Sequence, residues 1–198
     1  HLCLEHLSRF LHKILRIALI MKEFTLTLFA IFGLLSARGL AAQGTESFFA
    51  EAGLRAGVDA EKRINLVSYE LFGEIDMDWS WNLSDSLRLN LNIETAIGGL
   101  YGESEHAVYG RMAPIAKLHL GDSPVTIVLS SGPSFYSKDT FDDYDIGGHF
   151  QFTTSVGLNW SFDDAWAASY RFQHTSNANL TEPNPGLDMH TVSIAYTF

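Results

Sequence analysis

Apolar and polar side chains alternate with a period of two along most of the chain, and no helical period competes with this pattern. One segment carries Val67, Tyr69 and Leu71 on one face and Ser68 and Glu70 on the other. Such segments run for about 12 to 17 residues, whereas strands of soluble proteins mostly have about five or six. A tilted strand crosses a bilayer in about 9–11 residues. The pattern therefore predicts strands that are long enough to span a membrane.

Short turns and longer loops join these segments alternately. The short turns are residues 82–85, 121–123 and 163–164, and the longer loops are 100–105, 137–147 and 177–186. Outer-membrane barrels show this alternation, with the short turns in the periplasm. We therefore predict an all-β fold, an eight-stranded antiparallel transmembrane β-barrel. Its predicted strands are roughly residues 48–59, 64–81, 86–99, 106–120, 124–136, 148–161, 165–176 and 187–198.

The last predicted strand supports an outer-membrane location. It ends in Phe198, and Tyr196, Ile194 and Val192 occupy the alternate positions before it. This arrangement resembles the assembly signal of bacterial outer-membrane barrels. An ordinary amphipathic strand is the alternative, but the alternation of loop lengths favours a barrel in a Gram-negative-type outer membrane.

The N-terminal region does not follow the strand pattern. Residues 21–42 contain a basic start, an apolar run and a small-residue region, which are the three parts of a secretory signal peptide. We predict a cleaved signal peptide at 21–42, the barrel at 43–198, and non-native upstream sequence at 1–20. One long N-terminal anchor helix is the alternative, which Arg38 and the small residues after it disfavour.

Charge and cysteine content narrow the possible partners. Residues 1–42 hold five of the 13 basic and two of the 23 acidic residues, so 8 basic and 21 acidic residues remain, a formal charge of −13. Binding to nucleic acid needs clustered Lys and Arg, so nucleic acid is excluded as a partner. The single cysteine, Cys3, also precedes the predicted barrel, and no metal-binding spacing is present. We therefore expect no disulfide, metal or cofactor.

Charged residues also fall on the inward face of the predicted strands. Eight strands enclose enough space for side chains but too little for an aqueous channel. Because buried charges must be paired, we expect salt bridges in the lumen, with a proton or ion pathway as the alternative. The expected members are Glu70, Glu74, Asp76, Asp78 and Glu94 with Arg55, Arg88, Arg111, Lys117 and Arg171.

Polar side chains occupy lipid-facing positions on the last two strands. His174 and Ser176 continue the outward face of one strand, and Asp188 and His190 lie on the outward face of the next. In an antiparallel hairpin, residues just before the loop oppose those just after it. A register that pairs 174 with 188, or is two residues off, brings His174, Ser176 and Asp188 together. These are the parts of an activated serine nucleophile, whereas a polar rim at the outer interface is the alternative.

Two segments of this hairpin carry a family resemblance. Phe172-Gln173-His174-Thr175-Ser176-Asn177-Ala178 and Asn184-Pro185-Gly186-Leu187-Asp188, followed by a Phe-ending strand, resemble the lipid A 3-O-deacylase (PagL-type) family. That family has an eight-stranded barrel and hydrolyses the ester at the 3 position of lipid A. The architecture matches over the whole predicted barrel, whereas the specific motif covers about residues 174–188.

The resemblance implies roles for individual residues. Ser176 is the implied nucleophile and His174 the implied general base, while Asn177 and Asn184 stabilise an oxyanion or shape the hairpin. The family carries Glu at the position of Asp188, whose side chain is one methylene shorter. Whether Asp188 is the acid therefore stays open, and the alternative is Glu182 in the loop.

The resulting hypothesis is an outer-membrane carboxylic ester hydrolase that acts on lipid A through an acyl-serine intermediate. Its expected partners are lipopolysaccharide and the outer membrane, and a homodimer is a further hypothesis. A non-catalytic small barrel of the structural or adhesin type is the main alternative. An acyltransferase barrel is a third hypothesis, although the sequence indicates no separate hydrocarbon pocket in the interior.

Overall fold

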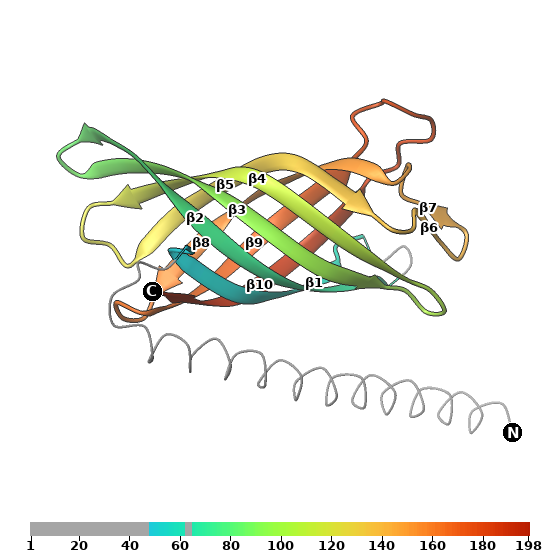
Figure 1. Cartoon of the computed structure of the whole chain (residues 1–198), viewed down its shortest axis with the longest axis horizontal. Coiled ribbons are helices and arrows are strands. Elements are labelled where there is room, and N and C mark those ends of the chain that lie inside the picture. Colours follow the sequence, from blue (N-terminus) through green and yellow to red (C-terminus); the bar gives the residue numbers. More distant parts are fainter. Residues whose placement is uncertain (1–47, 62–64) are drawn as a thin grey trace, which may run out of the picture. The chain divides into compact units, whose positions relative to one another are not determined.

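The computed structural model describes residues 48–61 and 65–198 (Figure 1). The predicted upstream sequence at 1–20 and the predicted signal peptide at 21–42 lie outside the described residues. Within the two described ranges, no helix has the length and apolar character needed to cross a membrane.

Eight long strands of the described part close into one antiparallel barrel, in the order β1-β10-β9-β8-β5-β4-β3-β2. Their bounds are Glu51–Asp59 (β1), Val67–Ser84 (β2), Leu87–Tyr101 (β3), His106–Leu120 (β4), Val125–Tyr136 (β5), Phe150–Ser161 (β8), Trp166–Ser176 (β9) and Leu187–Thr197 (β10). Thr140–Phe141 (β6) and Tyr144–Asp145 (β7) form a small separate hairpin between β5 and β8. The predicted barrel is confirmed. The β6–β7 hairpin was not predicted, because strands of two residues are too short to alternate.

Long loops and short turns lie at opposite ends of the barrel (Figure 1). The turns β2–β3, β4–β5 and β8–β9 lie at the end marked C, whereas the β6–β7 hairpin and the β9–β10 loop lie at the other end. Strand β1 pairs with both β2 and β10, which closes the sheet. A closed sheet has no free edge and satisfies its backbone hydrogen bonds internally, as a bilayer requires.

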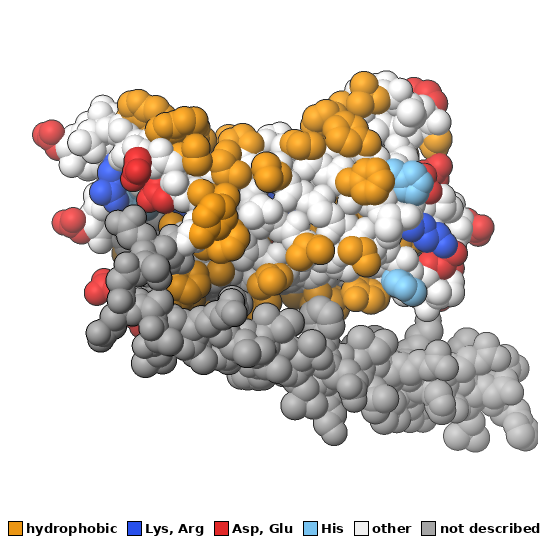
Figure 2. Space-filling view, in the orientation of Figure 1, with side chains coloured by type: hydrophobic (Ala, Val, Ile, Leu, Met, Phe, Trp, Pro, Cys, Tyr) orange, Lys and Arg blue, Asp and Glu red, His pale blue; other side chains and the backbone are white. Residues whose placement is uncertain are grey.

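The outer wall of the barrel is apolar. Leu129, Val156 and Val192 point outward and are 52%, 50% and 59% exposed. On the face shown in Figure 2, hydrophobic side chains occupy the middle of the barrel, and charged side chains gather at its two ends. An outward apolar band with polar ends is the surface that a bilayer-spanning barrel presents. The barrel is therefore a membrane-spanning one.

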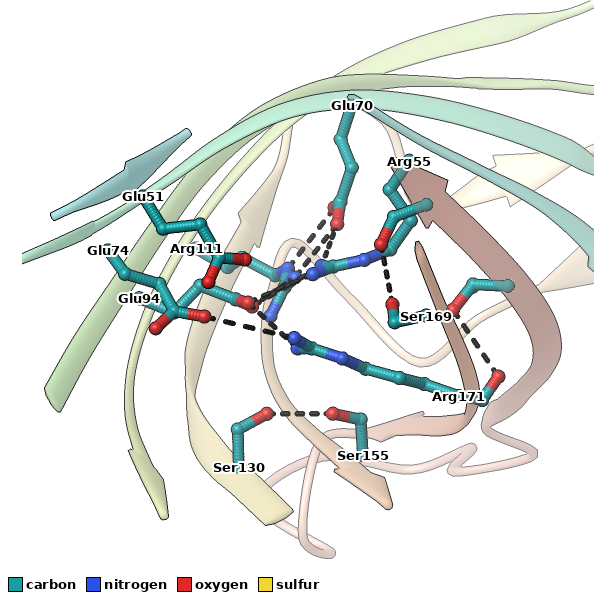
Figure 3. A network of polar contacts seen from close by, with 12 residues as sticks. Glu51, Arg55, Glu70, Glu74, Glu94, Arg111, Ser130, Ser155, Ser169 and Arg171 are labelled. Atoms are coloured by element: carbon teal, nitrogen blue, oxygen red, sulfur yellow. Dashed lines mark hydrogen bonds and ion pairs between the residues drawn. The ribbon is translucent and has the colours of Figure 1, made fainter. Parts of the chain in front are cut away.

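The lumen holds a connected set of ion pairs (Figure 3). Arg111 Nη2 lies 2.8 Å from Glu70 Oε1 and 2.7 Å from Glu94 Oε1, and Arg55 contacts the same two carboxylates. Arg171 Nη1 adds a third guanidinium to Glu94 at 2.7 Å. The predicted pairing of lumen charges is confirmed for these groups. The set comprises four basic and four acidic side chains: Arg55, Arg111, Lys117, Arg171, Glu51, Glu70, Glu74 and Glu94.

Three of the predicted lumen charges, Asp76, Asp78 and Arg88, are exposed instead. The pairing of β2 with β3 is irregular between Ile75 and Trp79, where Asp78 has a φ of 56°. Beyond this bulge, the β2–β3 hairpin projects past the rest of the barrel (Figure 1). The prediction for these three residues is wrong, because alternation does not mark where a bulged strand leaves the lumen.

Apolar side chains fill the interior at the end with the long loops. Phe141 and Ile146, from the loop between β5 and β8, are 0% and 1% exposed. They belong to one buried cluster with Leu187 and Met189 of β10. This packing anchors the loop that carries β6 and β7 against the strand that carries Asp188.

Candidate active site

The hairpin of β9 and β10 places the predicted site residues on the outside of the barrel. In β9, Gln173 and Thr175 are buried, His174 is exposed, and Ser176 is half-buried on the same outward phase. Asp188 lies directly opposite His174 in the register of the two strands. The predicted pairing of 174 with 188 is confirmed, and it brings these outward side chains onto one patch.

His174 and Asp188 are joined by a short side-chain hydrogen bond. His174 Nδ1 lies 2.6 Å from Asp188 Oδ1, and the two side chains are 49% and 28% exposed. The aspartate thus reaches the imidazole despite being shorter than glutamate. Glu182 is exposed and, within the described chain, forms no hydrogen bond to His174. A carboxylate at Nδ1 keeps the proton on that nitrogen and leaves Nε2 available as a base.

Ser176 is the last residue of β9, two positions beyond His174. Residues two apart on one face of a strand have Cα atoms about 7 Å apart, so their side chains can converge. Among the described residues, the Ser176 hydroxyl has no hydrogen-bond partner. Catalytic hydrogen bonds are often long in the absence of substrate and tighten in the complex. The hydroxyl is therefore free to meet both a substrate and the imidazole.

Asparagine side chains hold the loop that follows Ser176. Asn177 is 1% exposed, and its Nδ2 donates to Gly147 O at 2.7 Å and Thr181 O at 2.8 Å. Its Oδ1 accepts a hydrogen bond from Asn179 N at 2.8 Å. Asn184 Oδ1 accepts from Asn177 N at 3.0 Å, and Asn184 Nδ2 donates to Asn179 Oδ1 at 2.9 Å. Both predicted asparagines thus use their carboxamides to build the loop.

Two further residues contact the site and were not predicted. Gly186 has a φ of 73°, and a Cβ at this position would lie 3.1 Å from His174 Cε1 and 3.1 Å from Thr175 O. Its carbonyl accepts a hydrogen bond from the Tyr144 hydroxyl at 2.5 Å. Tyr144 lies 42 positions earlier in the sequence, in the two-residue strand β7. A local sequence pattern therefore carries no signal for this contact.

Two other histidines of the described residues, His190 and His106, have aromatic partners away from this group. His190 is on the outward face, but its Nδ1 lies 2.8 Å from the Tyr170 hydroxyl, and the two rings stack with centroids 6.0 Å apart. His106 stacks on Tyr101 at the end with the long loops. Residues 48–61 and 65–198 contain no group of three or more His, Cys, Asp or Glu side chains placed to hold a metal ion.

The fold has counterparts among solved structures. The outer membrane enzyme PagL aligns with a TM-score of 0.66 at 19% identity, covering 75% of this chain and 100% of that one. Neisserial surface protein A aligns with a TM-score of 0.53 at 10% identity, covering 77% of this chain and 98% of that one. At these identities, the likeness shows the fold alone.

Sequence comparisons show the family. The lipid A deacylase PagL of Bordetella bronchiseptica is 37% identical over 67 residues, which are 34% of this chain and 38% of that protein. The match thus spans well under half of that relative's length. A family model described as lipid A 3-O-deacylase (PagL) matches residues 67–197, a range that includes β2 to β10 and the hairpin with His174 and Asp188. The chain belongs to the lipid A 3-O-deacylase (PagL) family.

Proposed function

We propose that this protein is an outer-membrane deacylase that hydrolyses the 3-position ester of lipid A, with Ser176, His174 and Asp188 as its catalytic group. The observation that carries the proposal is the hydrogen bond between His174 and Asp188 on the membrane-facing wall. Polar groups that face lipid cost free energy, so they are expected where they serve a function. Because Ser176 lies next to this pair on the lipid-facing wall, the substrate that reaches it is a membrane lipid.

The position along the barrel supports an outer-leaflet substrate. The site lies next to the β9–β10 loop, at the end that carries the long loops (Figure 1). Long loops of outer-membrane barrels are extracellular. From the turn after β8, His174 is about ten residues up a tilted strand, or roughly 25 Å. This height corresponds to the outer interface, where lipopolysaccharide is the abundant lipid.

In the proposed reaction, Ser176 Oγ attacks the ester carbonyl carbon while His174 Nε2 accepts the hydroxyl proton. The bond from the carbonyl carbon to the sugar oxygen then breaks, and the imidazolium returns the proton to that oxygen. A water molecule, deprotonated by His174, next attacks the carbonyl carbon of the acyl-serine ester. The bond from that carbon to Ser176 Oγ breaks, the imidazolium returns the proton to Oγ, and the fatty acid leaves. Asp188 holds the imidazole and stabilises its charged form. This sequence of steps requires no cofactor.

Asn177 and Asn184 enter the proposal as residues that shape the site. An oxyanion donor must point its N–H group at the reacting oxygen. The carboxamides of these two residues instead hydrogen-bond to their own loop and to Gly147 of the β5–β8 loop, and Asn177 N is occupied by Asn184 Oδ1. These contacts support a role in holding the loop beside Ser176.

Export and assembly complete the proposal. The basic start and apolar run of residues 21–42 support cleavage of this segment, with 1–20 as upstream sequence. N-terminal sequencing of the protein from outer membranes tests this assignment, and a start within residues 1–20 contradicts it. A homodimer in the membrane is a further proposal, which chemical crosslinking in intact cells tests.

The test of the activity is Ser176→Ala, with Ser131→Ala as the matched control. Ser131 faces outward and is paired with Thr154, which in turn is paired with His174, so both serines lie at a similar height. Mass spectra of lipid A from expressing cells should show loss of one ester-linked acyl chain with wild type and Ser131→Ala. Ser176→Ala should show no loss.

Two outcomes overturn this proposal. Unmodified lipid A in cells with well-inserted wild-type protein indicates a non-catalytic barrel. Appearance of the removed acyl chain on another lipid, without free fatty acid, indicates an acyltransferase.

A further inference from the structure

The loop between β5 and β8 is fixed to the barrel on two sides. Its Phe141 and Ile146 side chains are buried in the apolar cluster at the barrel end. Lys138 Nζ lies 2.5 Å from Glu105 Oε1, which ties the loop to the β3–β4 connection. The small β6–β7 hairpin within this loop therefore forms a firm support beside the β9–β10 loop.

From this support, hydrogen bonds cross to the loop that carries the site. Tyr144 Oη donates to Gly186 O at 2.5 Å. Gly147 O accepts from Asn177 Nδ2 at 2.7 Å and from Thr181 Oγ1 at 3.1 Å. Of these three hydrogen bonds, only the one from Tyr144 ends on Gly186, the residue whose backbone lies beside His174.

Gly186 forms a wall beside the imidazole. A Cβ at Gly186 would lie 3.1 Å from His174 Cε1 and 3.8 Å from His174 Nε2, so the backbone approaches the ring closely. His174 is about half exposed, and its other described restraint is the hydrogen bond from Nδ1 to Asp188. A ring held at a single atom can still swing about that atom. The Gly186 backbone, which leaves too little room for a Cβ beside the ring, restricts this motion.

We infer that Tyr144 is a positioning residue for His174: its hydroxyl fixes the Gly186 carbonyl, and Gly186 in turn fixes the imidazole against Asp188. This inference rests on the proposed function, because it assigns the support of the proposed base. Misplacing a catalytic group by about 1 Å can cost about a hundredfold in rate. Tyr144 touches no reacting atom, so its effect falls on the rate of serine attack and leaves lipid binding unchanged.

The test is Tyr144→Phe, with Tyr101→Phe as the control at the same end of the barrel. Tyr144 is partly buried against the apolar cluster, so phenylalanine keeps the packing and removes only the hydroxyl. Two readouts are used: kcat and KM on lipid A in detergent micelles, and the rate at which a fluorophosphonate labels the serine. The second readout reports activation of the nucleophile without requiring lipid A. Resistance of the folded band to unboiled SDS shows that each barrel is intact.

Tyr144→Phe should lower kcat and the labelling rate by between about ten- and a hundredfold, with KM, the folded band and the Tyr101→Phe control unchanged. Equal labelling rates for wild type and Tyr144→Phe overturn the inference and leave the proposed function standing. Equal labelling of wild type and Ser176→Ala overturns the proposed function itself.

A double variant tests the route through Gly186. The single variant Gly186→Ala places a methyl group against the imidazole in a backbone conformation that L residues rarely adopt, so its activity should fall further than that of Tyr144→Phe. If Tyr144 acts through Gly186, then adding Tyr144→Phe to Gly186→Ala should change the labelling rate less than twofold. If the losses of the two single variants multiply in the double variant, Tyr144 does not act through Gly186.

Discussion

The charged groups inside the barrel and those on its outer wall are arranged in opposite ways. Inside, the four glutamates of the ion-pair set each contact at least one cation. Glu94 contacts three guanidinium groups while wholly buried. Outside, His174 contacts one carboxylate and remains half exposed. Groups whose charges are all paired hold a structure in place, whereas a paired imidazole with one free nitrogen can move a proton. Pairing and exposure thus distinguish the ion pairs in the lumen from the proposed catalytic pair on the outer wall.

The largest expected effect is at the outer pair. Asp188→Asn should lower the rate of deacylation about 10⁴-fold, because an amide no longer holds the imidazole in the required tautomer. Asp188→Glu should retain substantial activity, since the family pattern described in the sequence analysis has glutamate at this position. Rates are measured on lipid A in micelles with barrels of equal folded fraction. Full activity of Asp188→Asn would show that the pair of His174 and Asp188 takes no part in the reaction.

A change in the lumen should affect stability and leave the chemistry intact. Glu94→Gln leaves three buried guanidinium groups short of a partner, so the free energy of unfolding should fall by about 3–5 kcal/mol. Denaturant unfolding of the barrel in detergent measures this loss, with the exposed turn variant Asp122→Asn as the control. The folded fraction of Glu94→Gln should keep its wild-type kcat. A lost kcat in folded Glu94→Gln would mean that lumen and site are coupled.

The loop beside the site should respond more weakly. Asn177→Ala removes the carboxamide that bonds Gly147 and Thr181, so kcat should fall about tenfold as the loop loosens. Asn82→Ala, in the exposed end of β2, is the control. Limited proteolysis should cut the β9–β10 loop faster in Asn177→Ala. A rate loss of about 10³ with unchanged proteolysis would instead identify Asn177 as an oxyanion donor.

The smallest effect is expected at the surface pair between Lys138 and Glu105. The hydrogen bond from Lys138, with a second from the backbone of Asp142, lowers the pKa of Glu105 below its ordinary value. Whatever stability the pair contributes is therefore present above the ordinary pKa of glutamate and is lost as pH falls through the lowered pKa. Melting temperatures of wild type and Glu105→Gln should differ slightly near pH 7 and converge once the pH falls below the lowered pKa of Glu105. A gap that widens on acidification contradicts this sign.

The strands and the outward phase of the site were predictable because they depend on local sequence. A period of two decides the face of each side chain, and the pairing of His174 with Asp188 follows from the position of the hairpin loop between them. This local information was enough to place Asp188, His174 and Ser176 on one outward patch.

Other features depend on contacts between distant parts of the chain. The Tyr144 hydroxyl meets Gly186 across 42 positions, and two-residue strands carry no periodicity. The bulge before Trp79 depends on a positive φ at Asp78, which a non-glycine residue seldom adopts. Alternation alone therefore predicts Asp76 and Asp78 in the lumen, whereas they are exposed at the bulge. Arg88 is exposed because it lies on β3 near the projecting end of the β2–β3 hairpin.

Strand β10 has two neighbours with different tasks. Along one edge it aligns Asp188 with His174, and along the other it forms the seam with β1. The proposed acid thus arrives on the strand that completes the cylinder, after β1 to β9 have been synthesised. In the proposed enzyme, hydrolysis therefore requires a closed barrel. A factor that inserts β10 into the sheet also enables the activity. A chain that stops before this step leaves the lipids intact.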